Sequence, residues 1–290
     1  KQKLEKNNIK FKDKSKGHGT ISIFSKDIVI EITSLRKDIR TFGRKAKVGF
    51  IDSFEQDAKR RDFTINSIYS DLEGNLFDPF DGIKDLKKNK IKFIGIPIKR
   101  VEEDNLRVLR YFRFVGNFNS NEQQLHSKSL NVCLENFLKI QSLSKERVQL
   151  EFFKLLLSEN VNFVLSILKN NNLLNFLING LQEMSYQSIN SMKKLPKELI
   201  YRIAYLIKET QIKTVEFNKS IKIGNDNVIK LHRILSMKYP INSENEAKIN
   251  KYYFGEEVAL INYKLNQFVN KKKVNKEILV ILNNWVVPKL

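Results

Sequence analysis

The chain has 290 residues, of which 41% are hydrophobic and 29% charged, so it is long and apolar enough to fold around a core. Its 52 Lys and Arg against 32 Asp and Glu give a net charge of +20, which favours a nucleic-acid partner, although a bias toward Lys, Asn and Ile would also produce this excess. A single cysteine excludes an internal disulfide and a cysteine-based zinc site, and without an apolar run of about 18 residues or a signal peptide we expect a cytoplasmic protein with no membrane partner.

The N-terminal part of the chain predicts a short hairpin. Residues 1–16 are polar and rich in Lys, so we expect a frayed entry there. Residues 21–24 and 28–33 are dominated by β-branched side chains and are separated by the polar pair at 26–27. This pattern indicates two strands joined by a turn.

Glu31 is the one charge inside the second predicted strand. It lies on the face opposite Ile30 and Ile32, which is consistent either with a solvent-facing residue or with a carboxylate held rigidly at a site. The residues that follow, 36–47, are basic and lack an apolar period, which predicts a mobile loop.

Capping and turn residues organise the next segment. Ser53 can cap a helix that begins near Phe54 and continues, with a break, through about residue 68. Residues 73–75 form a turn between short strands, and residues 90–94 predict another strand.

The apolar spacing becomes helical after Pro97. We expect a helix over residues 101–114, with Leu106 and Leu109 facing inward, and further helices at 144–157, 161–168, 197–208, 227–237 and 276–286. The predicted fold class is therefore α+β at the front and all-α behind.

Three blocks dense in Arg and Asp are the strongest functional signal, at residues 60–67, 78–86 and 103–110. In the third block, Asp104 and Arg107 are spaced i, i+3 on the predicted helix and would share a face. They form either a plain ion pair or a base-reading pair, in which a carboxylate accepts from an exocyclic amine and a guanidinium donates to ring acceptors. Such a pair would accept cytosine or adenine and reject uracil or guanine.

The first block suits the sugar and phosphates of a nucleotide. Arg60 and Arg61 can neutralise phosphate charge, while Asp62 or Asn66 can hydrogen-bond a ribose hydroxyl. Arg110 extends the basic face of the third block, toward phosphate or solvent. In the middle block we expect a tight turn.

The three blocks and one later segment resemble four sequence motifs of the class II CCA-adding enzymes and bacterial poly(A) polymerases. Residues 60–67 match Arg-Arg-Asp-Phe-Thr-x-Asn-Ala except at Ser67, and residues 78–86 match Asp-Pro-x-Gly-Gly-x-x-Asp-Leu except at Asp81. Residues 103–110 match Glu-Asp-x-x-Arg-x-x-Arg, and residues 144–154 resemble the motif on the neck helices. The resemblance spans residues 17 to about 157.

The resemblance implies a truncated nucleotidyltransferase head with a mixed or antiparallel sheet at 1–95, a helical neck at 96–160 that binds base and RNA, and a helical body and tail at 161–290. It implies that Asp104 and Arg107 read the base, and that Arg60, Arg61 and Asp62, with Asn66 and Arg110, bind the nucleotide. CTP and ATP would be the substrates and the tRNA 3′ end the partner. Residues 36–47 would be the loop that switches addition from C to A.

One part of the family pattern does not occur in this sequence. The family carries an Asp-x-Asp pair on a strand, whereas here Asp13 is followed by Lys14 and Ser15. The resemblance implies that Glu31 is the third, catalytic carboxylate of a Mg²⁺ site whose other carboxylates are missing from this chain, and one carboxylate cannot hold such ions alone. We therefore expect a C-terminal part or split form that needs the missing segment, supplied for example by a separate N-terminal polypeptide.

Three functions remain open on the sequence alone. The leading hypothesis is template-independent CCA addition to tRNA. The first alternative is poly(A) addition by an enzyme of the same family, and the second is a non-catalytic RNA-binding remnant.

Overall fold

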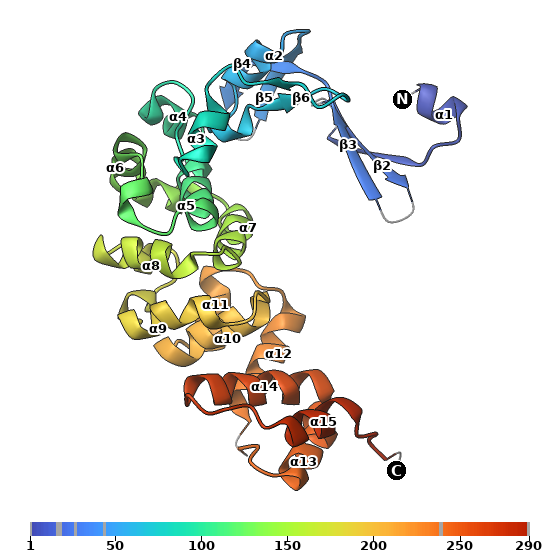
Figure 1. The fold of residues 1–290 in the computed structure, drawn as a ribbon, viewed down its shortest axis with the longest axis vertical. Helices are drawn as coiled ribbons and strands as arrows, with labels where there is room; N and C mark the ends of the chain where they lie inside the picture. The colour runs from blue at the N-terminus through green and yellow to red at the C-terminus, as the bar shows by residue number, and fades with distance from the viewer. Residues whose placement is uncertain (1, 16–18, 26–27, 43–44, 238–239, 289–290) are drawn as a thin grey trace. The chain divides into compact units, whose positions relative to one another are not determined.

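The fold was analysed in a computed structural model that describes residues 2–15, 19–25, 28–42, 45–237 and 240–288. Named strands lie between Phe11 and Phe77, and from Gly82 onward every named element is a helix (Figure 1). The predicted class, α+β in front and all-α behind, is confirmed. The chain divides into two compact units, Lys1–Arg107 with His126–Val132, and Val108–Leu125 with Cys133–Leu290. The finer boundaries at residues 95 and 160 stay predictions.

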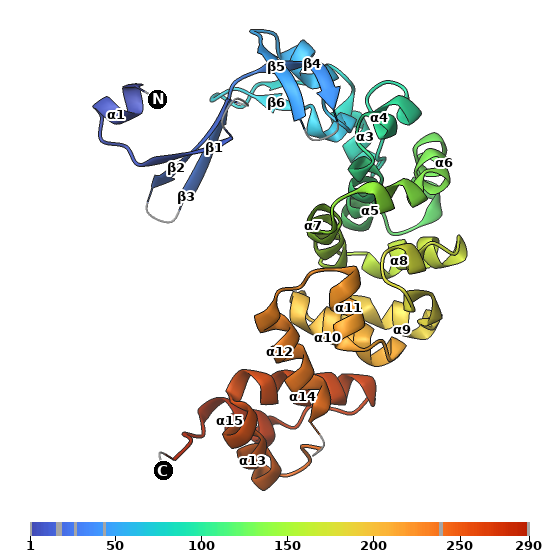
Figure 2. The same ribbon diagram turned by 180° about the vertical axis from the view of Figure 1, so that it is seen from behind.

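The first sheet contains the expected hairpin. Strands β2 (Thr20–Ser25) and β3 (Ile28–Thr33) pair antiparallel, and β1 (Phe11–Ser15) joins them in the order β1-β2-β3 (Figure 2). The prediction of a frayed entry was wrong, because a short helix α1 (Gln2–Lys6) and then β1 occupy that segment. β1 is polar and is held by its pairing with β2, which no local pattern reveals. The predicted turn at 26–27 lies outside the described residues.

The segment predicted as a loop is a second antiparallel pair. Strands β4 (Arg36–Phe42) and β5 (Lys45–Phe50) align from Arg36 opposite Phe50 to Phe42 opposite Lys45. The loop prediction was therefore wrong. Its basis was the missing apolar period, but strand pairing rests on backbone hydrogen bonds that a basic sequence can also make.

The capping prediction is confirmed at the next helix, α2 (Phe54–Lys59). Ser53 Oγ accepts from the Gln56 backbone N–H at 3.3 Å. After the predicted break come the 3₁₀ helix η1 (Thr64–Asn66) and the strands β6 (Tyr69–Ser70) and β7 (Leu76–Phe77), which flank the expected turn.

The strand predicted at 90–94 is absent among the described elements. The segment makes one isolated antiparallel bridge, between Phe63 and Phe93, whose ring centroids lie 4.7 Å apart. Both side chains are buried. The apolar run therefore reflects burial of side chains around an irregular backbone.

The remaining chain is helical. Its α-helices are α3 (Gly82–Lys87), α4 (Pro97–Glu103), α5 (Leu106–Phe118), α6 (Ser127–Glu135), α7 (Lys145–Leu156), α8 (Val161–Asn170), α9 (Tyr186–Ser191), α10 (Leu199–Thr210), α11 (Thr214–Ser220), α12 (Asn225–Ser236), α13 (Glu244–Phe254), α14 (Glu256–Val269) and α15 (Lys276–Asn284). Short 3₁₀ helices lie between them at Glu122–Gln124, Phe137–Ser142, Leu174–Phe176, Leu181–Glu183 and Met192–Lys194. The five helices predicted beyond residue 143 are confirmed to within a few residues.

Apolar helix faces make the core of the second unit. Helix α5 buries Val108, Leu109 and Phe112, and the Phe112 ring packs edge-on against Phe137 at 5.7 Å. A separate cluster joins α13, α14 and α15 through Ala247, Ala259, Tyr263, Ile278 and Leu282, with Ile241 beside them. Within the described residues, no helix is long and apolar enough to cross a membrane.

Candidate nucleotide-binding site in the first unit

Asp57, on α2, is the centre of the site. Its side chain is 1% exposed and accepts from Arg60 Nη2 at 2.6 Å and from Arg61 Nη2 at 3.1 Å. The Tyr69 hydroxyl donates to the same carboxylate at 2.9 Å, and the Arg36 backbone N–H at 3.2 Å. Sequence reasoning missed Asp57, although its i+3 and i+4 spacing to the two arginines was a usable signal.

These contacts fix the charge states of the cluster. Burial alone would raise the pKa of Asp57, but the hydrogen bonds from Arg60, the Arg36 backbone and Tyr69 outweigh burial and lower it. Burial and the hydrogen bond to Asp57 raise the pKa of Tyr69 to about 12. The carboxylate therefore stays ionised and the phenol stays a donor at neutral pH.

The two arginines are held to different degrees. Arg60 also donates through Nε to the Arg36 carbonyl at 3.0 Å, and its side chain is 19% exposed. Arg61 donates through Nη1 to the Asn66 carbonyl at 2.7 Å, stacks over the Tyr69 ring at 4.9 Å, and is 36% exposed. Arg61 is thus the more accessible cation of the pair.

Asp62 and Asn66 stabilise the turn that follows α2. Asp62 Oδ1 accepts from the Phe63 backbone N–H at 3.0 Å and from Asn66 Nδ2 at 2.8 Å. The Asp62 side chain is buried, which leaves Asn66 as the more exposed polar group of the two. Both predicted sugar contacts therefore lie beside Arg61 in one hydrogen-bonded turn.

The middle motif is a structural turn, as expected. Asp78 accepts from the backbone N–H groups of Gly82 and Ile83, both at 2.8 Å, at the start of α3. Asp81 has φ of 56°, a left-handed conformation, which accounts for the glycine in the family pattern at this position. A Cβ on Gly82 would lie 2.3 Å from the Thr64 carbonyl oxygen, so only glycine fits.

The predicted continuous helix over 101–114 is wrong, because the chain breaks between α4 and α5. Asp104 is extended, with φ of −157° and ψ of 107°, and its Oδ1 accepts from the Leu106 backbone N–H at 3.1 Å. Asp side chains compete for backbone donors, so Asp104 caps a new helix instead of continuing the old one.

Arg107 makes a carboxylate contact, to Glu103, that was not predicted from the sequence. Its Nη1 donates to Glu103 Oε2 at 2.5 Å and to the Arg100 carbonyl at 2.9 Å. Its Nη2 donates to the Arg60 carbonyl at 3.4 Å. The structure thus brings Arg107 to the arginine cluster of the first block, with Asp104 at the adjacent helix start.

Arg110 lies further along α5, in the second unit. There Glu151, 6% exposed in its side chain, pairs with Arg113 Nε at 3.0 Å and lies 3.8 Å from Arg110 Nη1. Lys154 Nζ contacts the same carboxylate at 3.4 Å. Arg110 therefore belongs to a cluster of cations around one buried carboxylate.

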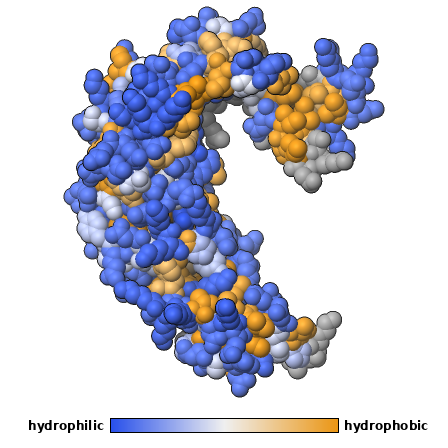
Figure 3. Space-filling model, viewed as in Figure 1, coloured by the Kyte–Doolittle hydropathy of each residue, from blue (hydrophilic) through white to orange (hydrophobic). Residues whose placement is uncertain are grey.

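Glu31 lies on β3, opposite Ser22 of β2. All residues of β3 are exposed, and Figure 3 shows an apolar surface over β2 and β3, where Phe24, Ile28, Ile30 and Ile32 are 47–64% exposed. Among the described residues, no group of three or more His, Cys, Asp and Glu side chains could hold a metal ion. The described part of the chain therefore does not by itself fit Mg²⁺.

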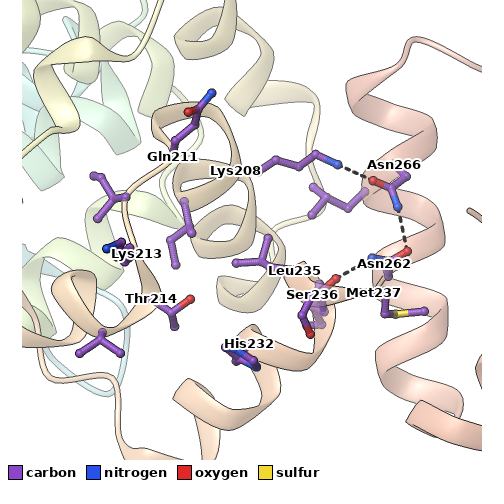
Figure 4. Close-up of a pocket in the computed structure, with 15 residues that line it drawn as sticks. Lys208, Gln211, Lys213, Thr214, His232, Leu235, Ser236, Met237, Asn262 and Asn266 are labelled. Atoms are coloured by element: carbon purple, nitrogen blue, oxygen red, sulfur yellow. Dashed lines mark hydrogen bonds between the residues drawn. The ribbon is translucent and has the colours of Figure 1, made fainter. Parts of the chain in front are cut away.

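A cavity of about 560 Å³ lies elsewhere, in the second unit between α10, α11, α12 and α14. Figure 4 shows Lys208 pointing to Asn266, which donates to Asn262 at 2.8 Å, and Asn262 donates in turn to the Ile234 carbonyl at 2.6 Å. Burial lowers the pKa of Lys208. This polar chain links three helices, and no residue of the three blocks lines the cavity.

Two segments of the chain match domains of the same family of proteins. Residues 1–92 match the poly A polymerase head domain, and residues 124–184 match the probable RNA and SrmB-binding site of polymerase A. The chain is 39% identical over 155 residues to CCA tRNA nucleotidyltransferase 1, mitochondrial, of Danio rerio, covering 53% of this chain and 36% of the relative. It is 28% identical over 258 residues to a CCA-adding enzyme of Streptococcus uberis, covering 86% and 63%.

Solved structures show the same fold. The Bacillus stearothermophilus CCA-adding enzyme in complex with CTP aligns with a TM-score of 0.76 at 25% identity, over 91% of this chain and 65% of that one. The chain thus spans between about a third and two thirds of the length of these relatives. On the matched domains, the motifs and the fold, it belongs to the family of class II CCA-adding enzymes and poly(A) polymerases.

Proposed function

We propose that the protein extends the 3′ end of tRNA, adding CCA from CTP and ATP without a nucleic-acid template. The observation that carries this proposal is the meeting of the first and third blocks, where Arg107 donates to the Arg60 carbonyl. Relatives named CCA-adding enzymes, one of them solved in complex with CTP, support it. The basic charge of the chain and its match to an RNA-binding region support tRNA as the partner.

Each predicted residue has a role in this proposal that its contacts allow. Arg61, the more exposed cation, contacts the phosphates, while Arg60 is largely occupied by Asp57 and orients the turn. Asn66, with Asp62 behind it, contacts the sugar. Asp104 accepts from the amine of cytosine or adenine, and Arg107 donates to a ring acceptor. Arg110, on α5, is proposed to contact phosphate as a nucleotide-binding residue.

Mg²⁺ would supply charge neutralisation at the triphosphate and activation of the attacking hydroxyl. We propose that Glu31 contributes one carboxylate to the Mg²⁺ site. The other carboxylates would come from an N-terminal segment that is not part of this sequence, for example from a separate polypeptide. The exposed apolar residues of β2 and β3 support a further segment packing near Glu31. The cytoplasmic location stays a prediction, since some relatives are named mitochondrial.

The test is a 3′-end labelling assay on tRNA lacking CCA, with CTP and ATP, using the chain alone and together with a family N-terminal segment that carries Asp-x-Asp. Addition of two C residues and then one A supports the proposal. Long A tails from ATP alone would support poly(A) addition, which the matched head-domain description favours. Tight tRNA binding without any addition under both conditions would support the RNA-binding remnant.

A further inference from the structure

Arg100, on α4, belongs to none of the three blocks, yet it joins two of them. Its Nη2 donates to the carbonyls of Lys59 and Arg61, the second at 2.7 Å, and its Nε donates to the Ile94 carbonyl at 3.1 Å. Its Nη1 donates to both Glu103 oxygens, at 3.0 and 2.7 Å. One guanidinium thus serves three backbone carbonyls and a carboxylate, and its side chain is only 11% exposed.

The carboxylate that Arg100 holds also holds Arg107. Glu103 Oε2 lies 2.7 Å from Arg100 Nη1 and 2.5 Å from Arg107 Nη1. Arg107 donates in addition to the Arg100 carbonyl at 2.9 Å. Glu103 is therefore a bridge between a buried arginine and the arginine predicted to read the base.

Both arginines also contact the same stretch of backbone. Arg100 reaches the carbonyls of Lys59 and Arg61, and Arg107 reaches the carbonyl between them, that of Arg60. These contacts fix the position of Arg107 relative to the turn that carries Arg61. A shift in Arg100 would move both ends of this link.

Burial and a second cation both act against the charge of Arg100. Burial, and then the nearby charge of Arg107, lower the pKa of Arg100, while Glu103 opposes both. Two arginines that share one carboxylate, itself 35% exposed, give only a modest stabilisation, so the arrangement leaves room for a positioning role.

We propose that Arg100 is a positioning residue that sets nucleotide choice by holding Arg107, through Glu103, in a fixed orientation relative to residues 59–61. This inference rests on the proposed function of the same site. A guanidinium reads a base edge only when its planar fork is aimed at the acceptors. An Arg107 free to rotate still attracts a nucleotide by charge but no longer distinguishes base edges.

Lysine at position 100 separates charge from geometry. It keeps the positive charge, but its three donors lack the planar fork and cannot serve three carbonyls and Glu103 together. Arg100→Lys should therefore bind nucleotides with similar overall affinity while the preference for CTP and ATP over UTP and GTP falls about tenfold. Glu103→Gln removes the negative charge that the two arginines share, and it should shift the preference in the same direction.

The experiment measures equilibrium binding of each of the four nucleoside triphosphates to the full chain, for the parent protein and the variants. Lys99→Met is the matched control, because Lys99 is exposed on the same helix and its loss removes one charge without touching the link. Circular dichroism and thermal melting check that each variant folds. We expect the parent and Lys99→Met to share one preference and the two link variants to lose it.

The outcomes separate the two hypotheses. Unchanged preference in a folded Arg100→Lys overturns the positioning role while leaving the proposed function intact. A parent protein that binds all four triphosphates equally, or binds none, overturns the base-reading site itself. If Arg100→Lys does not fold, the preference of Glu103→Gln decides, and an unchanged preference there also overturns the inference.

Discussion

Arg60 Nη2 lies 2.6 Å from Oδ1 of Asp57, a carboxylate that is 1% exposed. Arg60, which was predicted to bind phosphate, therefore forms an ion pair with a buried side chain. Asp57→Asn should destabilise the fold by about 3 kcal/mol, because two arginines lose their shared counter-charge. Urea unfolding measures the change. Asp52→Asn, an exposed acidic residue nearby, is the control and should have little effect; equal loss in both variants would contradict the central role of Asp57.

Gly82 should tolerate no side chain. Gly82→Ala should cost about 3 kcal/mol, since the new Cβ would lie 2.3 Å from the Thr64 carbonyl and the backbone would have to move. Gly74→Ala provides the comparison, because Gly74 has φ of 89° but no atom within 4 Å of a new Cβ, so its cost of about 1 kcal/mol comes from backbone strain alone. Thermal denaturation of both variants tests the order, and a smaller loss at position 82 would refute the close approach.

Asp104→Asn should separate base reading from helix capping. Asn can still accept from the Leu106 N–H and keep the start of α5, but its amide no longer repels a carbonyl. We expect stability within about 0.5 kcal/mol of the parent and selection against UTP and GTP relaxed by about tenfold or more. Asp104→Ala should lose both properties, and Arg107→Ala should weaken CTP and ATP evenly. Competition among the four nucleotides decides, and intact selection in both Asp104 variants would remove the base-reading role.

His126 should make the fold sensitive to mild acid. Its Nδ1 accepts from the Ser129 backbone N–H at 3.3 Å at the start of α6, and burial, then the charge of Lys92, lower the pKa of His126. The folded state therefore favours the neutral ring, and its stabilisation is lost as pH falls from the ordinary value of about 6.5 toward the lower folded pKa. Melting temperature between about pH 7.5 and 5.5 should fall in the parent and fall less in His126→Asn, which keeps a cap acceptor. Parallel curves would exclude His126 as the cause.

RNA binding should be mainly electrostatic. A chain with net charge +20 that neutralises several phosphates should show log affinity falling linearly with log salt between about 50 and 200 mM. Replacing Lys271, Lys272 and Lys273 by Gln should leave the slope nearly unchanged, because we expect these exposed, consecutive lysines to stay solvated and not to contact phosphate. Filter binding with tRNA measures the slope, and an affinity independent of salt would contradict the prediction.

Local signals predicted much of this molecule. The Ser53 cap and the later helices were correct because caps and apolar periods are short-range features. The strand β1 and the pair β4–β5 were missed, since these polar or basic segments have no apolar period and are held by backbone pairing with the neighbouring strand. In the site, the arginines were identified by motif, whereas Asp57 was missed because its role depends on burial. The break at Asp104 was missed because the helical apolar pattern continues across it.

The strand β3 has consequences for handling the protein. It is the last strand in the order β1-β2-β3 of the described sheet, and Ile28, Val29, Ile30 and Ile32 are all about half exposed or more. A β-branched edge strand with apolar side chains on both faces can template the addition of another strand. The purified chain should therefore self-associate as its concentration rises. A charged replacement such as Ile30→Lys should keep it monomeric, which would make crystallisation and solution NMR of the isolated chain practical.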